Sequence, residues 1–128
     1  PSFERTAFGS RSIPTLEPIG TSVYDLKWSD SEKKLARRAF EAALTHELAE
    51  LMAEFKAKAA AAAEPDDMWS VQDFLHRKRR EIDEKYDYRY SQLPLVFGRL
   101  LREGRIQEQQ LSGLAEEKLS YIRRIASL

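Results

Sequence analysis

Beyond an N-terminal tail, apolar residues recur every three to four positions through most of the chain, the spacing of amphipathic α-helices. In the first such stretch the apolar positions are Phe40, Leu44, Leu48, Leu51 and Phe55. Ser29 and Glu32 precede this stretch at the spacing of a capping box, which places the helix start near the next residue. The pair Glu64-Pro65 ends it, because a residue before proline is disfavoured in the helical conformation. The pattern predicts a first helix over about residues 30–63.

A second amphipathic stretch follows the proline, with Asp66 and Asp67 as candidate caps for its first free amides. Its apolar positions, which we expect to face the core, are Met68, Val71, Leu75, Ile82 and Tyr86. The spacing continues to about Tyr90 and predicts a second helix over about residues 66–91. Two long helices around a short Pro-Asp-Asp break favour an antiparallel hairpin, which we call the stalk.

Two shorter apolar stretches complete the chain. Pro94 suits the first turn of a third helix, and Gly104 is a suitable left-handed stop for it. A fourth helix is expected from about Gln107, with inward positions Leu111, Leu114, Ala115, Ile122 and Ile125. These helices predict a small two-helix head over about residues 94–128, so the predicted fold class is all-α, a long antiparallel helical hairpin plus the head.

The first predicted helix is longer than a small domain is wide, since about 34 residues extend roughly 50 Å. Its apolar stripe is narrow and has charged residues on both sides, a pattern typical of a helix that packs on a partner helix. We therefore predict a homodimer whose interface includes Leu48, Met52 and Phe55.

The first 27 residues differ from the rest of the chain in composition. They contain three of the five prolines and two of the five glycines, without a sustained helical period. We expect residues 1–27 to form a tail, flexible or loosely docked, and residues 28–128 to form a single helical domain.

Length and composition restrict the function further. The 128 residues suit one domain, and 21 basic side chains balance 21 acidic ones, so no net charge attracts nucleic acid or an anionic membrane. The absence of cysteine excludes disulfides and thiolate chemistry. No stretch approaches the roughly 20 apolar residues of a membrane span, and the start shows no signal-peptide pattern. We expect a cytoplasmic protein without membrane insertion.

Candidate catalytic or metal-binding residues are few. His46-Glu47 begins a sequence similar to a zinc-protease helix, but Glu50 stands where the second histidine ligand is required. The only other histidine, His76, has no serine or cysteine partner implied by the sequence. We therefore expect no enzymatic activity, no cofactor and no metal site.

His76 begins a basic run over residues 76–80, the pattern that would favour nucleic-acid binding. On a helix these side chains point in all directions, and acidic residues follow at positions where they can pair with them. We expect a charge-laced helix and no nucleic-acid partner. Nucleic-acid binding stays an alternative that requires the cations to form one unpaired, exposed stripe.

The most informative residue of the second helix is Trp69. At about 100° per residue it lies roughly 130° from the centre of the predicted core stripe, among polar neighbours that include Gln72 and Asp73, with Arg79 at the edge between the two faces. A tryptophan framed by an aspartate and an arginine has the composition of a protein-binding hot spot. The alternative is that Trp69 packs on the first helix or the tail.

At these residues the chain resembles a known family, the fluorescence recovery proteins, which regulate the orange carotenoid protein of cyanobacteria. The resemblance covers about residues 28–128, in order and almost without gaps. The motifs that carry it are Trp28-Ser29 with Glu32, Asp66-Asp67-Met68-Trp69, Asp73-Phe74-Leu75, Lys78-Arg79, Glu81-Ile82-Asp83, Lys85-Tyr86-Asp87, Val96-Phe97, Leu100-Leu101 and Glu103-Gly104.

The resemblance implies an all-helical dimer with a stalk and a head on each subunit. It also implies binding to the light-activated red form of the orange carotenoid protein, mainly through the C-terminal domain of that protein. The bound regulator speeds the return to the compact orange form and so ends energy quenching at the phycobilisome. This activity is non-enzymatic, because differential binding alone lowers the barrier.

Carried over by position, the partner-binding residues of the family correspond here to Trp69, Gln72, Asp73, Arg79, Leu95 and Tyr121. The family has a histidine at Gln72, an aromatic residue at Leu95 and a lysine at Tyr121. The tail is also foreign to the family pattern. These departures leave a first alternative open, an interaction protein of the same scaffold with a different protein client.

Overall fold

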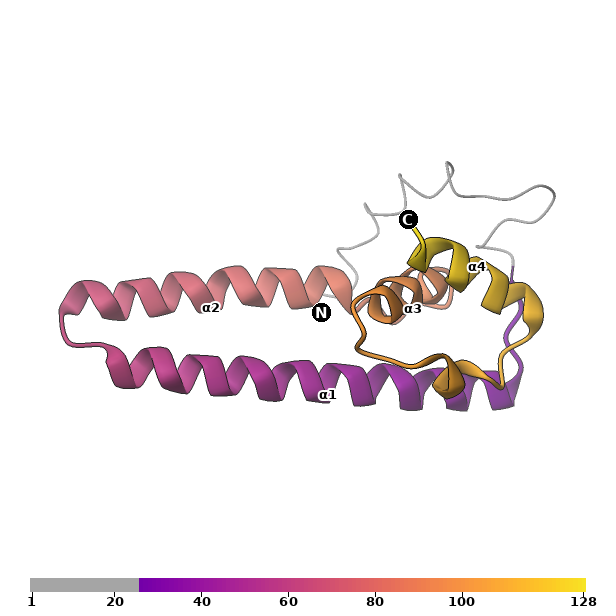
Figure 1. The fold of residues 1–128 in the computed structure, drawn as a ribbon, viewed down its shortest axis with the longest axis horizontal. Helices are drawn as coiled ribbons and strands as arrows, with labels where there is room; N and C mark the ends of the chain where they lie inside the picture. Colours follow the sequence, from indigo (N-terminus) through magenta and orange to yellow (C-terminus); the bar gives the residue numbers. More distant parts are fainter. Residues whose placement is uncertain (1–25) are drawn as a thin grey trace.

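The computed structural model describes residues 26–128, so the predicted tail lies almost entirely outside the described residues. The elements are α1 (Asp30–Ala61), α2 (Pro65–Lys85), α3 (Leu93–Arg102), the 3₁₀-helix η3 (Glu108–Leu111) and α4 (Glu116–Ala126). Figure 1 shows α1 and α2 as an antiparallel stalk, with α3 and α4 packed at the end where α1 begins and α2 ends. The predicted all-α fold with a helical hairpin and a head is confirmed. Among residues 26–128, no helix combines the length and apolar composition needed to cross a bilayer.

The start of α1 follows the predicted capping box. The Ser29 amide donates to Glu32 Oε1 at 2.9 Å, and the Glu32 amide donates to Ser29 Oγ at 3.2 Å. The buried residues of α1 all belong to its first half: Glu32, Ala36, Ala39, Phe40 and Ala43. The small alanine side chains in this half allow the head to approach closely, whereas the second half of α1 has only α2 beside it (Figure 1).

The second helix ends earlier than predicted, at Lys85 instead of about residue 91. The chain leaves the helix at Tyr86, whose ring is fully buried against the edge of Phe40, with ring centroids 5.4 Å apart. Its hydroxyl donates to Glu47 Oε1 at 2.7 Å. The buried position of this ring is not compatible with a continued helix, so the chain leaves the helix here and continues toward α3 of the head. At the other end of α2, the Asp67 carboxylate accepts the amides of Ala63 and Glu64, both at 2.9 Å.

The predicted core stripe of α2 is wrong at two positions. Met68 and Leu75 are exposed, while Phe74 is the buried apolar residue that faces α1. Val71 and Ile82 are half-buried. The physical reason is that α2 has only one helix beside it along most of its length, so only the narrow side that contacts α1 is covered.

The core of the protein lies in the head and the first half of α1. Its largest fully buried apolar side chains include Tyr86, Phe97, Leu93, Leu100, Ile106, Leu111 and Ile122. Gly104 follows α3 with φ of 76°, the left-handed conformation that the sequence predicts there. The predicted fourth helix from about Gln107 is wrong in its start, because η3 and a turn come first and α4 begins at Glu116. This break lets both Leu111 and Leu114 reach the core, while Ala115 stays exposed.

A network of charged side chains joins the stalk to the head. The buried Lys85 Nζ donates to Glu47 Oε2 at 2.7 Å and to Glu103 Oε1 at 2.8 Å. Arg105 Nε lies 3.1 Å from Glu47 Oε1. Burial together with the hydrogen bond to the Glu47 carboxylate raises the pKa of Tyr86, so its hydroxyl stays a donor at neutral pH. The network thus links α1, the end of α2 and the segment that follows α3.

Candidate partner-binding surface

Four of the six sequence-predicted partner-binding residues lie on α2 and are exposed: Trp69, Gln72, Asp73 and Arg79. We call them the stalk patch. The Trp69 ring keeps 58% of its surface in contact with solvent, so it is neither a core residue nor covered by α1. From Trp69 to Arg79 the patch extends about 15 Å along the helix axis.

The four side chains of the stalk patch form two adjacent lines along α2. Trp69 and Asp73 are one turn apart and share a side of the helix, and Gln72 and Arg79 are two turns apart and share another. At about 100° per residue, Trp69 and Gln72 lie roughly 60° apart around the helix. The patch therefore wraps the side of α2 that points away from α1 and offers a carboxylate, an amide and a guanidinium around one aromatic ring.

Arg79 is held only loosely in the free protein. Its Nε lies 3.8 Å from Asp83 Oδ2, and most of the guanidinium side chain is exposed. A surface ion pair of this kind contributes about 0–1 kcal/mol. A partner carboxylate can therefore engage the Arg79 guanidinium at a small cost.

The two residues wrongly assigned to the core complete the exposed surface of α2. Met68, Gln72, Leu75 and Arg79 follow one another at intervals of four, three and four residues, so apolar and polar side chains alternate along one line. Met68 is 56% exposed. The spacing of three to four residues that led us to predict Met68 and Leu75 as core positions therefore marks an exposed line of the helix instead.

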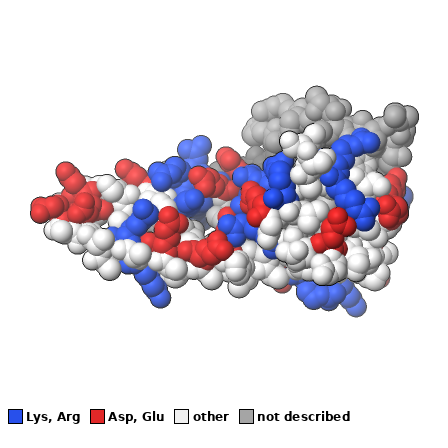
Figure 2. Space-filling view, viewed as in Figure 1, with Lys and Arg blue, Asp and Glu red and all other residues white. Residues whose placement is uncertain are grey.

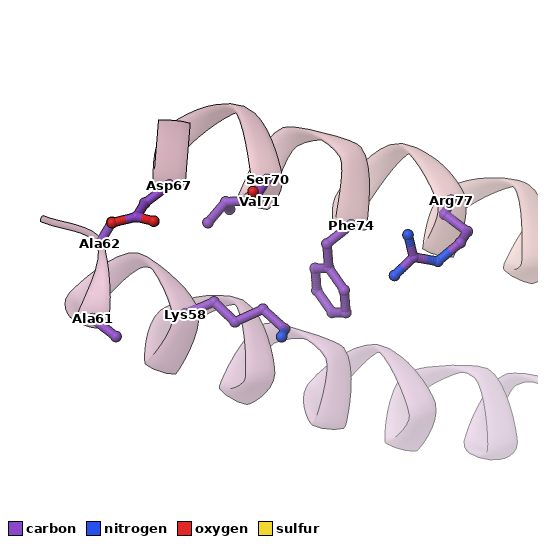
Figure 3. Close-up of a pocket in the computed structure, with 8 residues that line it drawn as sticks. All are labelled: Lys58, Ala61, Ala62, Asp67, Ser70, Val71, Phe74 and Arg77. Carbon is purple, nitrogen blue, oxygen red and sulfur yellow. The ribbon is translucent and has the colours of Figure 1, made fainter. Parts of the chain in front are cut away.

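A notch opens at the tip of the stalk between α1 and α2, on the side of α2 opposite the stalk patch. Figure 3 shows Phe74 pointing from α2 toward α1, with the side chains of Lys58 and Arg77 on either side of the ring. The Lys58 ammonium lies 4.9 Å from the ring centroid, and Asp67 and Ser70 line the far end of the notch. No catalytic pair lies in it, since Asp67 is already bonded to two backbone amides. The notch adds a shape that a partner side chain can fill.

The other two predicted partner-binding residues do not lie on this surface. Tyr121 is only 5% exposed and packs with half-buried Leu95 and Leu26 on the head. A buried tyrosine in this position supports the head and offers little surface to a partner. The structure brings together the four stalk residues and leaves Leu95 and Tyr121 in a separate cluster.

The three predicted dimer residues lie on the second half of α1. Leu48 and Met52 are exposed, Met52 by 53%, and Phe55 is half-buried. Lys58 of α1 and Phe74 of α2 face each other across the stalk. Going back six residues from Lys58 to Met52 turns about 120° around α1, and going back six residues from Phe74 to Met68 turns about 120° around α2 in the same direction of rotation along the chain. Because the helices are antiparallel, equal rotations lead to the same side of the stalk. One side therefore bears an apolar strip made of Leu48, Met52, Phe55, Met68 and Leu75.

His46 of α1 and the basic run of α2 are the candidates that the sequence offers for a metal site or a nucleic-acid site. His46 is exposed and its Nδ1 lies 3.3 Å from Glu50 Oε2 on the next turn. Among residues 26–128 no group of three or more potential ligands lies close enough to hold a metal ion. The basic run of α2 is partly paired, with Lys78 Nζ 3.5 Å from Glu81 Oε1. Figure 2 shows blue and red side chains interspersed along the stalk, and the single stripe of unpaired cations required for nucleic-acid binding is absent from this face.

Comparison with known proteins places this geometry among photoprotection regulators. A family model described as "Photoprotection regulator fluorescence recovery protein" matches residues 28–126. The fluorescence recovery protein of Synechocystis sp. is 43% identical over 101 residues, which cover 79% of this chain and 93% of that protein.

Two solved structures share the fold. The fluorescence recovery protein of Fremyella diplosiphon superposes with a TM-score of 0.75 at 37% identity and covers 80% of this chain and 100% of its own. That of Synechocystis sp. gives a TM-score of 0.75 at 42% identity with the same coverage. The described part of the chain is thus similar to these regulators over its whole helical domain.

Proposed function

Because this chain belongs to the fluorescence recovery protein family, we propose that it is a protein-binding regulator that ends photoprotection. It binds the light-activated red form of an orange carotenoid protein and speeds the return of that form to the compact orange state. The observation that supports this proposal most is the stalk patch, where Trp69 stays exposed among Asp73, Gln72 and Arg79. A tryptophan framed by such groups is typical of a binding hot spot.

Binding alone provides the activity. If the regulator contacts the closing state of the carotenoid protein more strongly than the open state, the barrier to closure falls by that difference. Each tenfold increase in rate requires about 1.4 kcal/mol of differential binding. One or two hydrogen bonds from Asp73 or Arg79, formed only as the client closes, are of this magnitude.

The first prediction concerns Arg79. We expect Arg79→Leu to abolish binding to the C-terminal domain of the carotenoid protein, because it removes a charged donor beside the exposed Trp69. Isothermal titration calorimetry measures the affinity, and circular dichroism checks that the helices persist. Arg102→Leu is the matched control, since Arg102 is an exposed arginine at the end of α3 and does not belong to the stalk patch. Binding by Arg79→Leu that equals binding by Arg102→Leu would remove Arg79 from the site.

The second prediction concerns the homodimer that forms part of the proposed function. The exposed apolar strip supports it, because monomeric proteins rarely leave a row of large apolar side chains in water. We expect Met52→Glu to dissociate the dimer, because the strip would then bury an unpaired charge. Light scattering is expected to show the mass of two chains for the unmodified protein and of one for Met52→Glu.

The control for the dimer prediction is Ala57→Glu, another exposed position about 140° from Met52 around α1. This variant is expected to keep the mass of two chains. A mass of one chain for the unmodified protein would contradict the dimer.

A second candidate function uses the same surface for a different protein client. The burial of Tyr121 favours it, because the head contact that the family makes with a lysine is missing here. The protein would have this function if it did not bind a carotenoid protein but bound another protein client, and if Arg79→Leu abolished that binding.

A further inference from the structure

A second charged surface lies at the opposite end of the stalk, where α1 begins. Four cations of α1 and two tyrosines from the segment between α2 and α3 line a shallow hollow: Lys33, Lys34, Arg37, Arg38, Tyr88 and Tyr90. We call these six residues the basic patch. Figure 2 shows blue side chains gathered along the edge of α1 beneath the head, in contrast to the mixed charges of the stalk.

The tyrosine rings hold the basic patch in place. The Arg37 guanidinium lies 3.8 Å from the centroid of the Tyr88 ring, and the Lys33 ammonium lies 5.3 Å from that of Tyr90. The two rings meet at 5.7 Å and 72°, and the Tyr88 hydroxyl donates to the carbonyl of Lys33 at 3.5 Å. Cation–π stacking of this kind orders a charged side chain without neutralising it.

The charge of the basic patch is largely uncompensated. Its one acidic neighbour in the hollow is Glu41, whose Oε2 lies 3.7 Å from Arg37 Nη1 between two exposed side chains. Within residues 26–128, Lys33, Lys34 and Arg38 form no ion pair, and neither does Asp30 one turn earlier. Four cations against one carboxylate is an unusual excess in a chain whose 21 basic and 21 acidic residues cancel.

We propose that the basic patch binds an acidic segment of a protein partner. Carboxylates of the segment pair with Lys34, Arg37 and Arg38, and one apolar or aromatic side chain of the segment enters the hollow beside the Tyr88 and Tyr90 rings. The patch lies on the first turns of α1, remote from Trp69 on α2, so this inference does not depend on the function proposed for the stalk patch.

Two observations favour an acidic polypeptide over a nucleic acid. The hollow is bordered by two tyrosine rings and presents more carbon than polar surface, which suits a protein side chain set among spaced carboxylates. The four cations allow only about four phosphate contacts, which give weak binding of a nucleic acid at physiological salt.

The third prediction tests this proposal with a fluorescein-labelled peptide of alternating glutamate and glycine that carries one central phenylalanine. Fluorescence anisotropy is expected to show saturable binding that weakens as salt is added. The double variant Lys34→Glu, Arg38→Glu is expected to lose at least tenfold in affinity. The control Lys56→Glu, Arg124→Glu makes the same charge change outside the patch and is expected to lose less than twofold. Both pairs are exposed, and circular dichroism checks that all forms are folded.

Three results would overturn the proposal: no saturable binding by the unmodified protein, equal losses for the two double variants, or tighter binding of single-stranded DNA of the same net charge. The last result would make the patch a nucleic-acid site. A peptide in which alanine replaces the phenylalanine is expected to bind several-fold more weakly, and equal affinity would remove the hollow from the site.

Discussion

We expect the replacement of Lys118 by methionine to lower the free energy of unfolding by about 3–5 kcal/mol, the magnitude typical of a buried ion pair that loses one partner. Lys118 is only 3% exposed, and its ammonium lies 3.2 Å from Glu32 Oε1 and donates also to the carbonyl of Lys27. The indole ring of Trp28 lies beside it, 5.0 Å from ring centroid to ammonium. Methionine keeps the volume but leaves the Glu32 carboxylate buried without a cation.

The ion pair between Glu32 and Lys118 also supports the head, because Glu32 contacts both the start of α1 and the segment before α4. Its Oε1 accepts the amide of Ser29 at 2.9 Å, and its Oε2 accepts the amide of Ala115 at 2.7 Å. One carboxylate therefore caps the start of α1 and fixes the residue that precedes α4. Burial alone would raise the pKa of Glu32, but the hydrogen bonds from Ser29, Ala115 and Lys118 outweigh it and lower the pKa below its ordinary value of 4.5. Since the folded-state pKa is lowered, this stabilisation is present above pH 4.5 and is lost as the pH falls through the folded value.

Urea unfolding followed by circular dichroism measures the effect of Lys118→Met. An exposed lysine provides the control, because Lys34→Met is expected to change the free energy of unfolding by less than about 0.5 kcal/mol. The double variant Glu32→Gln, Lys118→Met removes the unpaired charge and is expected to unfold at higher urea than Lys118→Met alone. Lys118→Met with unchanged stability at pH 7 would show that the pair contributes nothing.

Gly98→Ala has the second large effect, because α3 and α4 touch at this glycine. A β-carbon on Gly98 would lie 2.5 Å from Ile125 Cγ2, 2.6 Å from Ile125 Cβ and 3.2 Å from the carbonyl oxygen of Ile122. Two of these atoms belong to a β-branched side chain near its backbone and one is backbone, so none can move aside easily. Overpacking of this kind typically costs about 1–3 kcal/mol, and we expect the upper end of that range.

A double-mutant cycle separates this clash from helix propensity. Alanine favours a helix more than glycine does, so without a clash Gly98→Ala would stabilise α3 by up to about 1 kcal/mol. Ile125→Ala alone is expected to lose about 2–5 kcal/mol through the cavity it leaves. In the Ile125→Ala background, Gly98→Ala is expected to cost less than in the unmodified protein, since Cγ2 of residue 125 is gone while its Cβ and the Ile122 carbonyl oxygen remain close. Additive losses in the double variant would contradict the close contact.

Much of the fold could be predicted because local chemistry determines it. The Ser29–Glu32 box fixes where α1 starts, Pro65 separates the two stalk helices, and Gly104 takes the positive φ that ends α3. The end of α2 could not be predicted in this way. Periodicity predicts a continued helix through Tyr86, but the tertiary position of its ring ends α2 at Lys85.

The stalk patch could be predicted because Trp69 interrupts a charged surface. The apolar strip could not, since helical periodicity does not distinguish a side that faces the same chain from one left exposed, as at Met68 and Leu75. The basic patch was missed for a different reason. Its tyrosines follow α2 and its cations precede the middle of α1, so only the folded hairpin brings Tyr88 beside Arg37.

The dark relaxation of a photoactivated orange carotenoid protein, followed by visible absorbance, tests the central claim most directly. Our account predicts that the unmodified protein and Arg102→Leu speed the return to the orange spectrum at least tenfold, and that Arg79→Leu leaves the spontaneous rate unchanged. A return that is equally slow with and without the unmodified protein would contradict the proposed function.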